Sequence, residues 1–131
     1  MRILVVEDNI ELSEVIEKDL FEAGFDVVVA NSGIEARQLL LESDFDLVLS
    51  DWKLPGVGGL DLLGFVRQKV GIPFVFMTGF AEDIETEDVY TSGATVFLAK
   101  PFDGKTLHAA VSKALGLQEA MSLPLQELLK R

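Results

Sequence analysis

Residues 3–8 read Ile3-Leu4-Val5-Val6-Glu7-Asp8, so four consecutive apolar side chains are followed at once by two carboxylates. A short, continuous apolar run favours a strand that is covered on both faces, which is typical of a parallel sheet between two layers of helices. Four further runs of this kind lie at residues 25–30, 46–50, 73–77 and 95–99. The sequence therefore predicts five parallel strands.

Segments with helical periodicity lie between and after these runs. In the first of them, Leu12, Val15, Ile16 and Leu20 repeat at intervals of three and four residues. We expect the remaining helices at about 33–41, 60–69, 81–92 and 104–115. Glycines follow four of the helical stretches, where a left-handed C-terminal residue is expected, and Asn9 and Asp103 stand at N-cap positions. These glycines are Gly24, Gly71, Gly93 and Gly116.

The composition is that of one small domain. The chain has 131 residues, no cysteine and a formal net charge of −11, and its first apolar run is too short for a signal peptide or a membrane span. A disulfide framework is excluded, and a bare phosphate backbone would be repelled, so we expect a cytoplasmic protein without membrane or direct nucleic-acid contacts.

The last fifteen residues are set apart from the five βα units. We expect one domain over residues 1–116 and a helical extension, or the start of a linker, over 117–131. Apolar residues continue at helical spacing in this extension, but Pro124 interrupts the hydrogen-bond ladder and predicts two short helical pieces. We expect the extension to pack on its own domain or on a second copy.

The order of the strands decides which residues meet. Right-handed crossovers and two-sided coverage favour the doubly wound order 2-1-3-4-5, with ligands at the carboxyl ends of the strands near the switch point between strands 1 and 3. Polar residues follow four of the five strands at that edge of the sheet. They are Glu7, Asp8, Asp51, Thr78 and Lys100.

Three carboxylates at neighbouring strand ends would raise one another's pKa unless a cation lies among them. Mg²⁺ suits such a site, because it is a hard ion that prefers oxygen ligands and is commonly shared with phosphate. A carboxylate that attacks phosphorus forms an acyl phosphate, and this step needs positioning and charge neutralisation. Mg²⁺, Lys100 and Thr78 are able to supply both.

Four motifs resemble those of the receiver domains of two-component response regulators. They occur in the same order along the chain as in that family, and each follows the expected strand. They are Val5-Val6-Glu7-Asp8-Asn9, Asp51 through Leu54-Pro55-Gly56 to Gly59, Thr78-Gly79, and Lys100-Pro101-Phe102. The resemblance covers about Met1 to Leu115. It implies an α/β, flavodoxin-like, doubly wound five-stranded parallel sheet with five helices.

The resemblance also implies a role for each site residue. Asp51 would be the phospho-acceptor, and Glu7 and Asp8 would hold Mg²⁺ together with Asp51 and the backbone carbonyl of Lys53. Thr78 and Lys100 would bind the phosphoryl group. Phe97 would be an aromatic switch, and the Lys100-Pro101 bond would be cis.

By the same resemblance, the chain would be a phosphorelay switch rather than a turnover enzyme, although it would catalyse its own phosphorylation and dephosphorylation. Its donor would be a histidine kinase or a histidine phosphotransfer protein. The signal would leave through the face formed by the fourth predicted helix (81–92), the fifth strand (95–99) and the fifth helix (104–115), to a downstream protein or a fused output domain. A homodimer is compatible with this function.

For several of these residues, a purely structural role is an alternative to the functional one. Thr78 could merely cap the next helix, Phe97 could be a plain core residue, and Lys100 could be a loop lysine. We expect His108 to be an ordinary helix residue and Trp52 to lean over the rim. The predicted helix 81–92 has weak helix propensity, which suits a movable element, although packing could fix it.

Two residues beside the site are candidates for tuning the lifetime of an acyl phosphate, namely Lys53 and Phe80, and Lys53 could equally be a solvated loop residue. Two rival functions remain. An aspartyl-phosphate phosphatase lacks support because Lys53 stands where its second aspartate is expected. A pseudo-receiver or flavin-binding module lacks a phosphate-cradling loop after the first strand.

Overall fold

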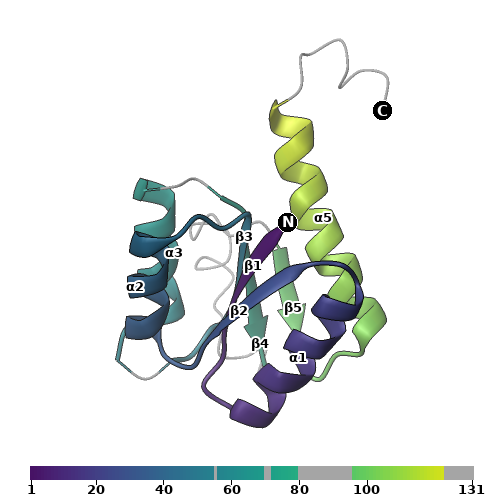
Figure 1. The fold of residues 1–131 in the computed structure, drawn as a ribbon, viewed down its shortest axis with the longest axis horizontal. Coiled ribbons are helices and arrows are strands. Elements are labelled where there is room, and N and C mark those ends of the chain that lie inside the picture. The colour runs from purple at the N-terminus through teal and green to yellow at the C-terminus, as the bar shows by residue number, and fades with distance from the viewer. Residues whose placement is uncertain (55, 70–71, 80–95, 123–131) are drawn as a thin grey trace.

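A computed structural model describes residues 1–54, 56–69, 72–79 and 96–122. Its centre is a five-stranded parallel sheet in the order β2-β1-β3-β4-β5, as predicted (Figure 1). Each strand begins or ends within one residue of the predicted run. The strands are β1 (Arg2–Val6), β2 (Asp26–Ala30), β3 (Leu47–Asp51), β4 (Phe74–Thr78) and β5 (Val96–Ala99).

Helices cover both faces of the sheet (Figure 1). One hydrophobic cluster joins the sheet to α1 (Ile10–Glu22) and α5 (Gly104–Ser122), and a second joins it to α2 (Gly33–Glu42) and α3 (Gly59–Lys69). These are four of the five predicted helices. The predicted helix 81–92, with Gly71 and Gly93, lies outside the described residues.

Strand β1 shows why its apolar run is continuous. Ile3 and Val5 belong to the cluster with α1 and α5, whereas Leu4 and Val6 belong to the cluster with α2 and α3, and all four side chains are fully buried. Because successive side chains of a strand point to opposite faces, an alternating pattern would have left one face polar. Burial of each such side chain contributes about 1.5–3 kcal/mol, so this strand anchors both layers.

The predicted helix caps are present. The Asn9 side chain accepts a hydrogen bond from the Leu12 N–H at 3.1 Å, and Asp103 accepts one from the Thr106 N–H at 2.8 Å. This last bond lowers the pKa of the Asp103 carboxyl. At the end of α1, Gly24 has a φ of +96° and the Phe25 N–H donates to the Leu20 carbonyl, so this glycine provides the left-handed turn.

The prediction that Gly116 ends the last helix is wrong. Helix α5 continues through Gly116 to Ser122, and the backbone of Gly116 is not left-handed. An interior glycine costs about 1 kcal/mol relative to alanine, which is less than the cost of starting a second helix, and the residues around it favour helix. The first of the two short predicted pieces is therefore part of α5, and Pro124 with the second piece lies outside the described residues.

None of the helices that the structure describes is both long and apolar enough to cross a membrane.

Helix α2 begins in close contact with the loop that follows β3. A Cβ atom at Gly33 would lie 2.0 Å from the Val57 carbonyl oxygen, so only glycine fits there. Gly64 of α3 offers a matched control, because a Cβ atom there meets nothing within 4 Å.

We predict that Gly33→Ala lowers the free energy of unfolding by about 1–3 kcal/mol, because the loop after β3 has to move away. Gly64→Ala should instead raise it by up to about 1 kcal/mol, through better helix propensity. Urea unfolding followed by Trp52 fluorescence measures both changes. Equal effects of the two substitutions would contradict the close approach.

Candidate functional site

The parallel strands place the predicted polar residues at one edge of the sheet. Glu7 and Asp8 follow β1, Asp51 ends β3, Thr78 ends β4 and Lys100 follows β5. We call this group the carboxyl-end rim.

The three carboxylates of the rim lie close together. Glu7, Asp8 and Asp51 each offer an oxygen atom, and these three atoms lie within 4.8 Å of one another. Their exposure differs, because Glu7 is fully buried, Asp51 is half-buried and Asp8 is exposed. The cluster is therefore open to solvent on the Asp8 side and closed behind Glu7.

Lys100 supplies a positive charge to this cluster. Its Nζ donates to Glu7 Oε1 at 2.5 Å and lies 3.3 Å from Asp51 Oδ2. Burial alone would lower the pKa of Lys100, but the hydrogen bond to Glu7 and the charge of Asp51 raise it above its ordinary value. Lys100 thus stays protonated and joins the carboxylates of β1 and β3.

Burial raises the pKa of the Glu7 carboxyl to about 7. The hydrogen bond from Lys100 opposes this shift, whereas the nearby carboxyl groups of Asp8 and Asp51 add to it. Mutual repulsion of the carboxylates, the cause expected from the sequence, is therefore present but is smaller than burial. The metal-free rim binds a proton more readily than an exposed carboxylate does.

Asn31 and Ser13, which the sequence analysis did not single out, position Glu7. The Glu7 N–H donates to the Ala30 carbonyl at 3.0 Å, and the Asn31 Nδ2 donates to the Glu7 carbonyl oxygen at 2.9 Å. Asn31 also reaches the hydroxyl of the buried Ser13, at 3.4 Å. The one signal in the sequence is a polar Ser13 among the apolar positions of α1.

Aromatic side chains lie behind the rim. The Trp52 and Phe76 rings meet edge to face with their centroids 4.8 Å apart, and Phe97 lies 5.9 Å from Trp52 and 5.6 Å from Phe76. Trp52 and Phe97 are half-buried and pack against the core cluster of α2 and α3. Trp52 is thus part of an aromatic cluster, rather than a side chain that only leans over the rim.

The remaining predicted residues have simpler places. The side chain of Lys53, two residues after Asp51 in the sequence, is exposed, and Thr78 is buried. His108 is exposed on α5 and meets the ring of Phe25 edge to face, as expected of an ordinary helix residue. The Lys100-Pro101 bond is cis, as the resemblance implied. Phe80 lies outside the described residues.

The rim fits a hard cation. Its three neighbouring carboxylates are the donors that Mg²⁺ prefers, and in the described part of the chain this is the one group of three or more such residues close enough to share an ion. The exposure of Asp8 leaves room for water and for a second ligand.

Comparisons with known proteins agree with this geometry. A family model described as "Response regulator receiver domain" matches residues 3–112. An uncharacterized transcriptional regulatory protein of Bacillus subtilis, YrkP, is 34% identical over 110 residues, which are 84% of this chain and 47% of that protein. The chain spans about half the length of the curated relatives it matches.

Solved structures are similar over nearly the whole chain. The N-terminal domain of a response regulator/sensory box/GGDEF protein from Carboxydothermus hydrogenoformans has a TM-score of 0.86 and 28% identity, and covers 94% of this chain and 100% of that one. The response regulator TrrA of Thermotoga maritima was solved in complex with Mg²⁺-BeF. It has a TM-score of 0.78 and 29% identity, and the match covers 86% of this chain and 97% of that one.

The pKa of Glu7 predicts how stability depends on pH in the absence of divalent metal. An exposed glutamate titrates near 4.5, whereas Glu7 titrates near 7 in the folded chain, so the folded chain keeps a proton that the unfolded chain has released. The contribution of Glu7 to the free energy of unfolding is therefore fully present below pH 4.5 and is lost as the pH rises to about 7. The loss is at most roughly 3–4 kcal/mol, since the pKa values of 4.5 and about 7 differ by about 2.5 and each pH unit corresponds to about 1.4 kcal/mol.

We predict that Glu7→Gln removes this part of the pH dependence, whereas Glu17→Gln, at an exposed position of α1, leaves it unchanged. Urea unfolding in EDTA, at several pH values across this window, gives the slopes to compare. The interpretation fails if the slopes for Glu7→Gln and the native chain coincide.

Proposed function

This chain belongs to the family of response regulator receiver domains, and from that membership we propose that Asp51 accepts a phosphoryl group from a phosphohistidine donor. The observation that carries the proposal is the contact of the half-buried Asp51 with Lys100, next to two further carboxylates. A nucleophilic carboxylate, a cation and an oxygen-rich metal site are the three components that phosphoryl transfer to aspartate requires.

In the proposed reaction, an oxygen of Asp51 attacks phosphorus in line with the bond to the donor imidazole. The P–O bond to Asp51 forms while the P–N bond breaks, and the imidazole leaves with its electron pair and takes up a proton. Mg²⁺, held by Glu7, Asp8, Asp51 and the backbone carbonyl of Lys53, would neutralise phosphoryl charge when bound. Lys100 neutralises a further oxygen, and Thr78 donates a hydrogen bond to another.

We propose that the phosphoryl group competes with Glu7 for Lys100. The Lys100 ammonium group already contacts both Glu7 and Asp51. A phosphoryl dianion on Asp51 would therefore attract the ammonium group away from Glu7. Lys100 directly follows β5, and Phe97 of that strand packs on Trp52, the neighbour of Asp51. Phe97 would carry the change to the face of β5, α5 and the predicted helix 81–92.

The partners follow from this role. The donor would be a histidine kinase or a histidine phosphotransfer protein, and the receiver of the signal would be a downstream protein or a fused output domain. The net charge of −11 disfavours direct binding of nucleic acid by this chain. We propose a cytoplasmic switch that catalyses its own phosphorylation and dephosphorylation, with residues 1–116 as receiver and 117–131 as extension. Helix α5 crosses that boundary.

The two rival functions have less support. An aspartyl-phosphate phosphatase would use an acid two residues after its nucleophile, and the residue there is Lys53, whose side chain is exposed. A module without phosphorylation would have no use for a lysine that contacts both a buried glutamate and Asp51.

We predict that the native chain, incubated with acetyl phosphate and Mg²⁺, gains the mass of one phosphoryl group and loses it in hydroxylamine, which cleaves acyl phosphates. Asp51→Asn should gain none, and the control Asp44→Asn, at an exposed position before β3, should gain it like the native chain. Intact-mass spectrometry measures all three. An adduct on Asp51→Asn, or one formed without Mg²⁺, would be evidence against the proposal.

We further propose that Lys53 prolongs the life of the acyl phosphate, together with Phe80. Hydrolysis needs a water in line with the bond to Asp51. A charged lysine offers only donors, so it stabilises phosphoryl oxygens without accepting a proton from this water.

We predict that Lys53→Asn shortens the half-life of the acyl phosphate about tenfold at saturating Mg²⁺, because an amide that orients the water is worth about 1.4 kcal/mol of barrier. Phe80→Glu should act in the same direction, and Lys105→Asn, an exposed lysine of α5, should have no effect. Decay of the adduct after removal of acetyl phosphate gives the half-lives. If Lys53→Asn decays at the native rate, Lys53 does not control access of water.

A further inference from the structure

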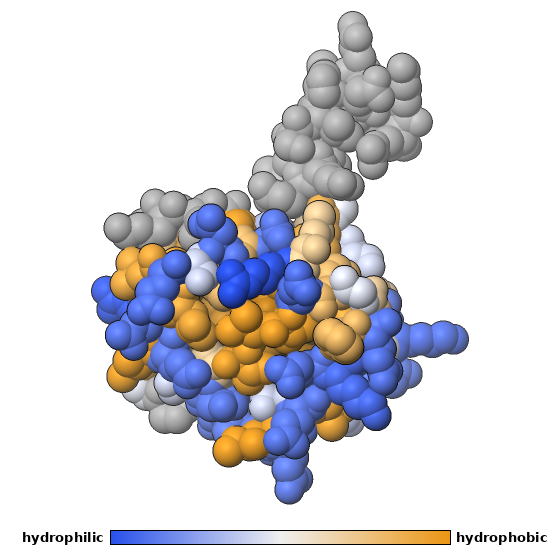
Figure 2. All heavy atoms as spheres, viewed as in Figure 1, coloured by the Kyte–Doolittle hydropathy of each residue, from blue (hydrophilic) through white to orange (hydrophobic). Residues whose placement is uncertain are grey.

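Strand β2 has an open edge. In the described part of the chain, β2 pairs with β1 alone and forms one border of the sheet. Figure 1 shows β2 crossing the front of the molecule between α2 and α1, and Figure 2, in the same view, shows apolar surface gathered at the centre of this face with hydrophilic surface around it. An exposed strand edge offers backbone donors and acceptors to another strand.

The backbone hydrogen bonds between β2 and the β1 side show which residues of β2 face inward and which face the open edge. The Asp26 N–H donates to the Met1 carbonyl at 2.9 Å, and the Ala30 carbonyl accepts from the Glu7 N–H at 3.0 Å, so residues 26 and 30 turn their backbone groups toward β1. In a parallel pair, alternate residues hydrogen-bond to opposite sides. Val27 and Val29 therefore direct their N–H and C=O groups to the open edge.

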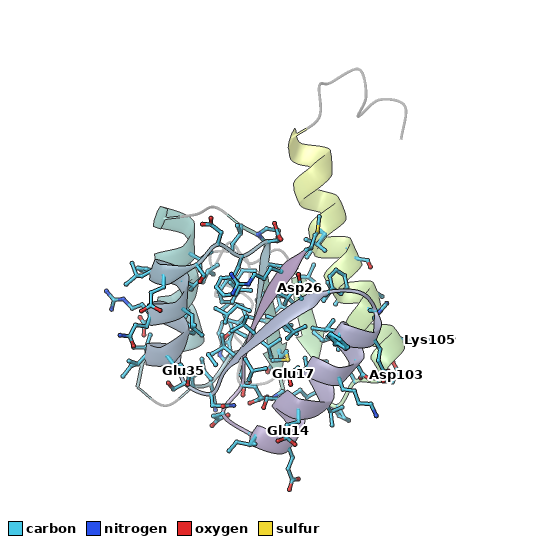
Figure 3. The ribbon with its side chains drawn as sticks, viewed as in Figure 1. Glu14, Glu17, Asp26, Glu35, Asp103 and Lys105 are labelled. Carbon is cyan, nitrogen blue, oxygen red and sulfur yellow. The ribbon has the colours of Figure 1, made fainter. Side chains whose placement is uncertain are left out.

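The side chains of this strand do little to block association. Val27, Val28 and Val29 are half-buried, the first and third against the cluster of α1 and α5 and the second against that of α2 and α3. Natural edges are commonly protected by lysine, proline or a charge in the middle of the strand. Here the one charged residue is Asp26, at the first position, where Figure 3 labels it.

We propose that this edge binds the β2 edge of a second copy of the chain, antiparallel and two-fold symmetric, with Val28 opposite Val28 of the partner subunit. Val27 then stands opposite Val29 of the partner subunit, and each of these two pairs exchanges two hydrogen bonds. Four backbone hydrogen bonds join the two sheets into one continuous sheet.

A second copy suits this edge because the edge is self-complementary. Its two outward residues lie symmetrically about Val28 and are of the same type, so the register that satisfies one chain satisfies the other. Asp26 stands opposite Ala30 of the partner subunit, and the two Asp26 side chains lie four residues apart along the strands, or about 14 Å. This exceeds the screening length of about 8 Å at physiological salt.

The net charge of each chain opposes association. At −11 per chain the two copies repel each other. The dimer should therefore tighten when salt is raised from roughly 0.05 M to roughly 0.5 M, in contrast to a complex held by opposite charges.

The test is the mass of the full chain by sedimentation velocity, at protein concentrations up to roughly 1 mM and at both salt levels. Val29→Pro removes an outward N–H that β1 does not use, and proline is tolerated at such edge positions. Val29→Thr is the matched control, since it keeps both the N–H and the branched side chain. We expect a dimer of the native chain, a dissociation constant at least about tenfold higher for Val29→Pro, and a near-native value for Val29→Thr.

Hydrogen exchange of the native chain is an independent measurement if Val29→Pro does not fold. The amides of Val27 and Val29 should become protected as concentration rises. A monomer under all conditions, a dimer as tight in a folded Val29→Pro as in the native chain, or a dimer in which these two amides exchange as fast as in the monomer would each overturn the proposal.

Discussion

A carboxylate that is withdrawn from water has to be paired, protonated or bound to a metal ion, and Glu7 stands under this constraint. The side chain is fully buried at the end of β1, where Lys100 donates to it and the pKa of its carboxyl is raised to about 7. Because Lys100 also reaches Asp51, the burial of one carboxylate fixes a cation beside the other. The arrangement of the rim follows from that pairing.

The pairing exists only because distant parts of the chain meet. Glu7 and Lys100 are brought together by the parallel order of β1, β3, β4 and β5, and Asn31, which follows β2, holds the Glu7 carbonyl oxygen. Each strand thus contributes through the residue at its carboxyl end. A rim of this kind responds to any new charge on Asp51, because Lys100 has two alternative acceptors within reach.

Much of this could be predicted from the sequence, since both the strand order and the rim depend on local patterns. Continuous apolar runs indicated two-sided burial, and polar residues directly after them indicated one common edge. Gly116 was misread because a glycine after a helical stretch is equally compatible with an interior position, and only the backbone of α5 distinguishes the two. Asn31 and Ser13 were missed because their contacts join residues 18 to 24 positions apart without a motif. At Glu7, burial raises the pKa more than repulsion by the neighbouring carboxylates does. This burial depends on tertiary packing, which the spacing of residues in the sequence does not reveal.

The most direct test of the account is the affinity of the rim for Mg²⁺, because the proposed chemistry requires the three carboxylates to act as one site. Trp52 lies next to Asp51 and packs on Phe76, so its fluorescence reports on the rim during a Mg²⁺ titration. The account predicts saturable binding to the native chain and to Asp44→Asn, and an affinity at least about tenfold weaker for Asp8→Asn, since an amide replaces an anionic ligand of a hard ion. Equal affinity of Asp8→Asn and the native chain would place the metal elsewhere and contradict the account.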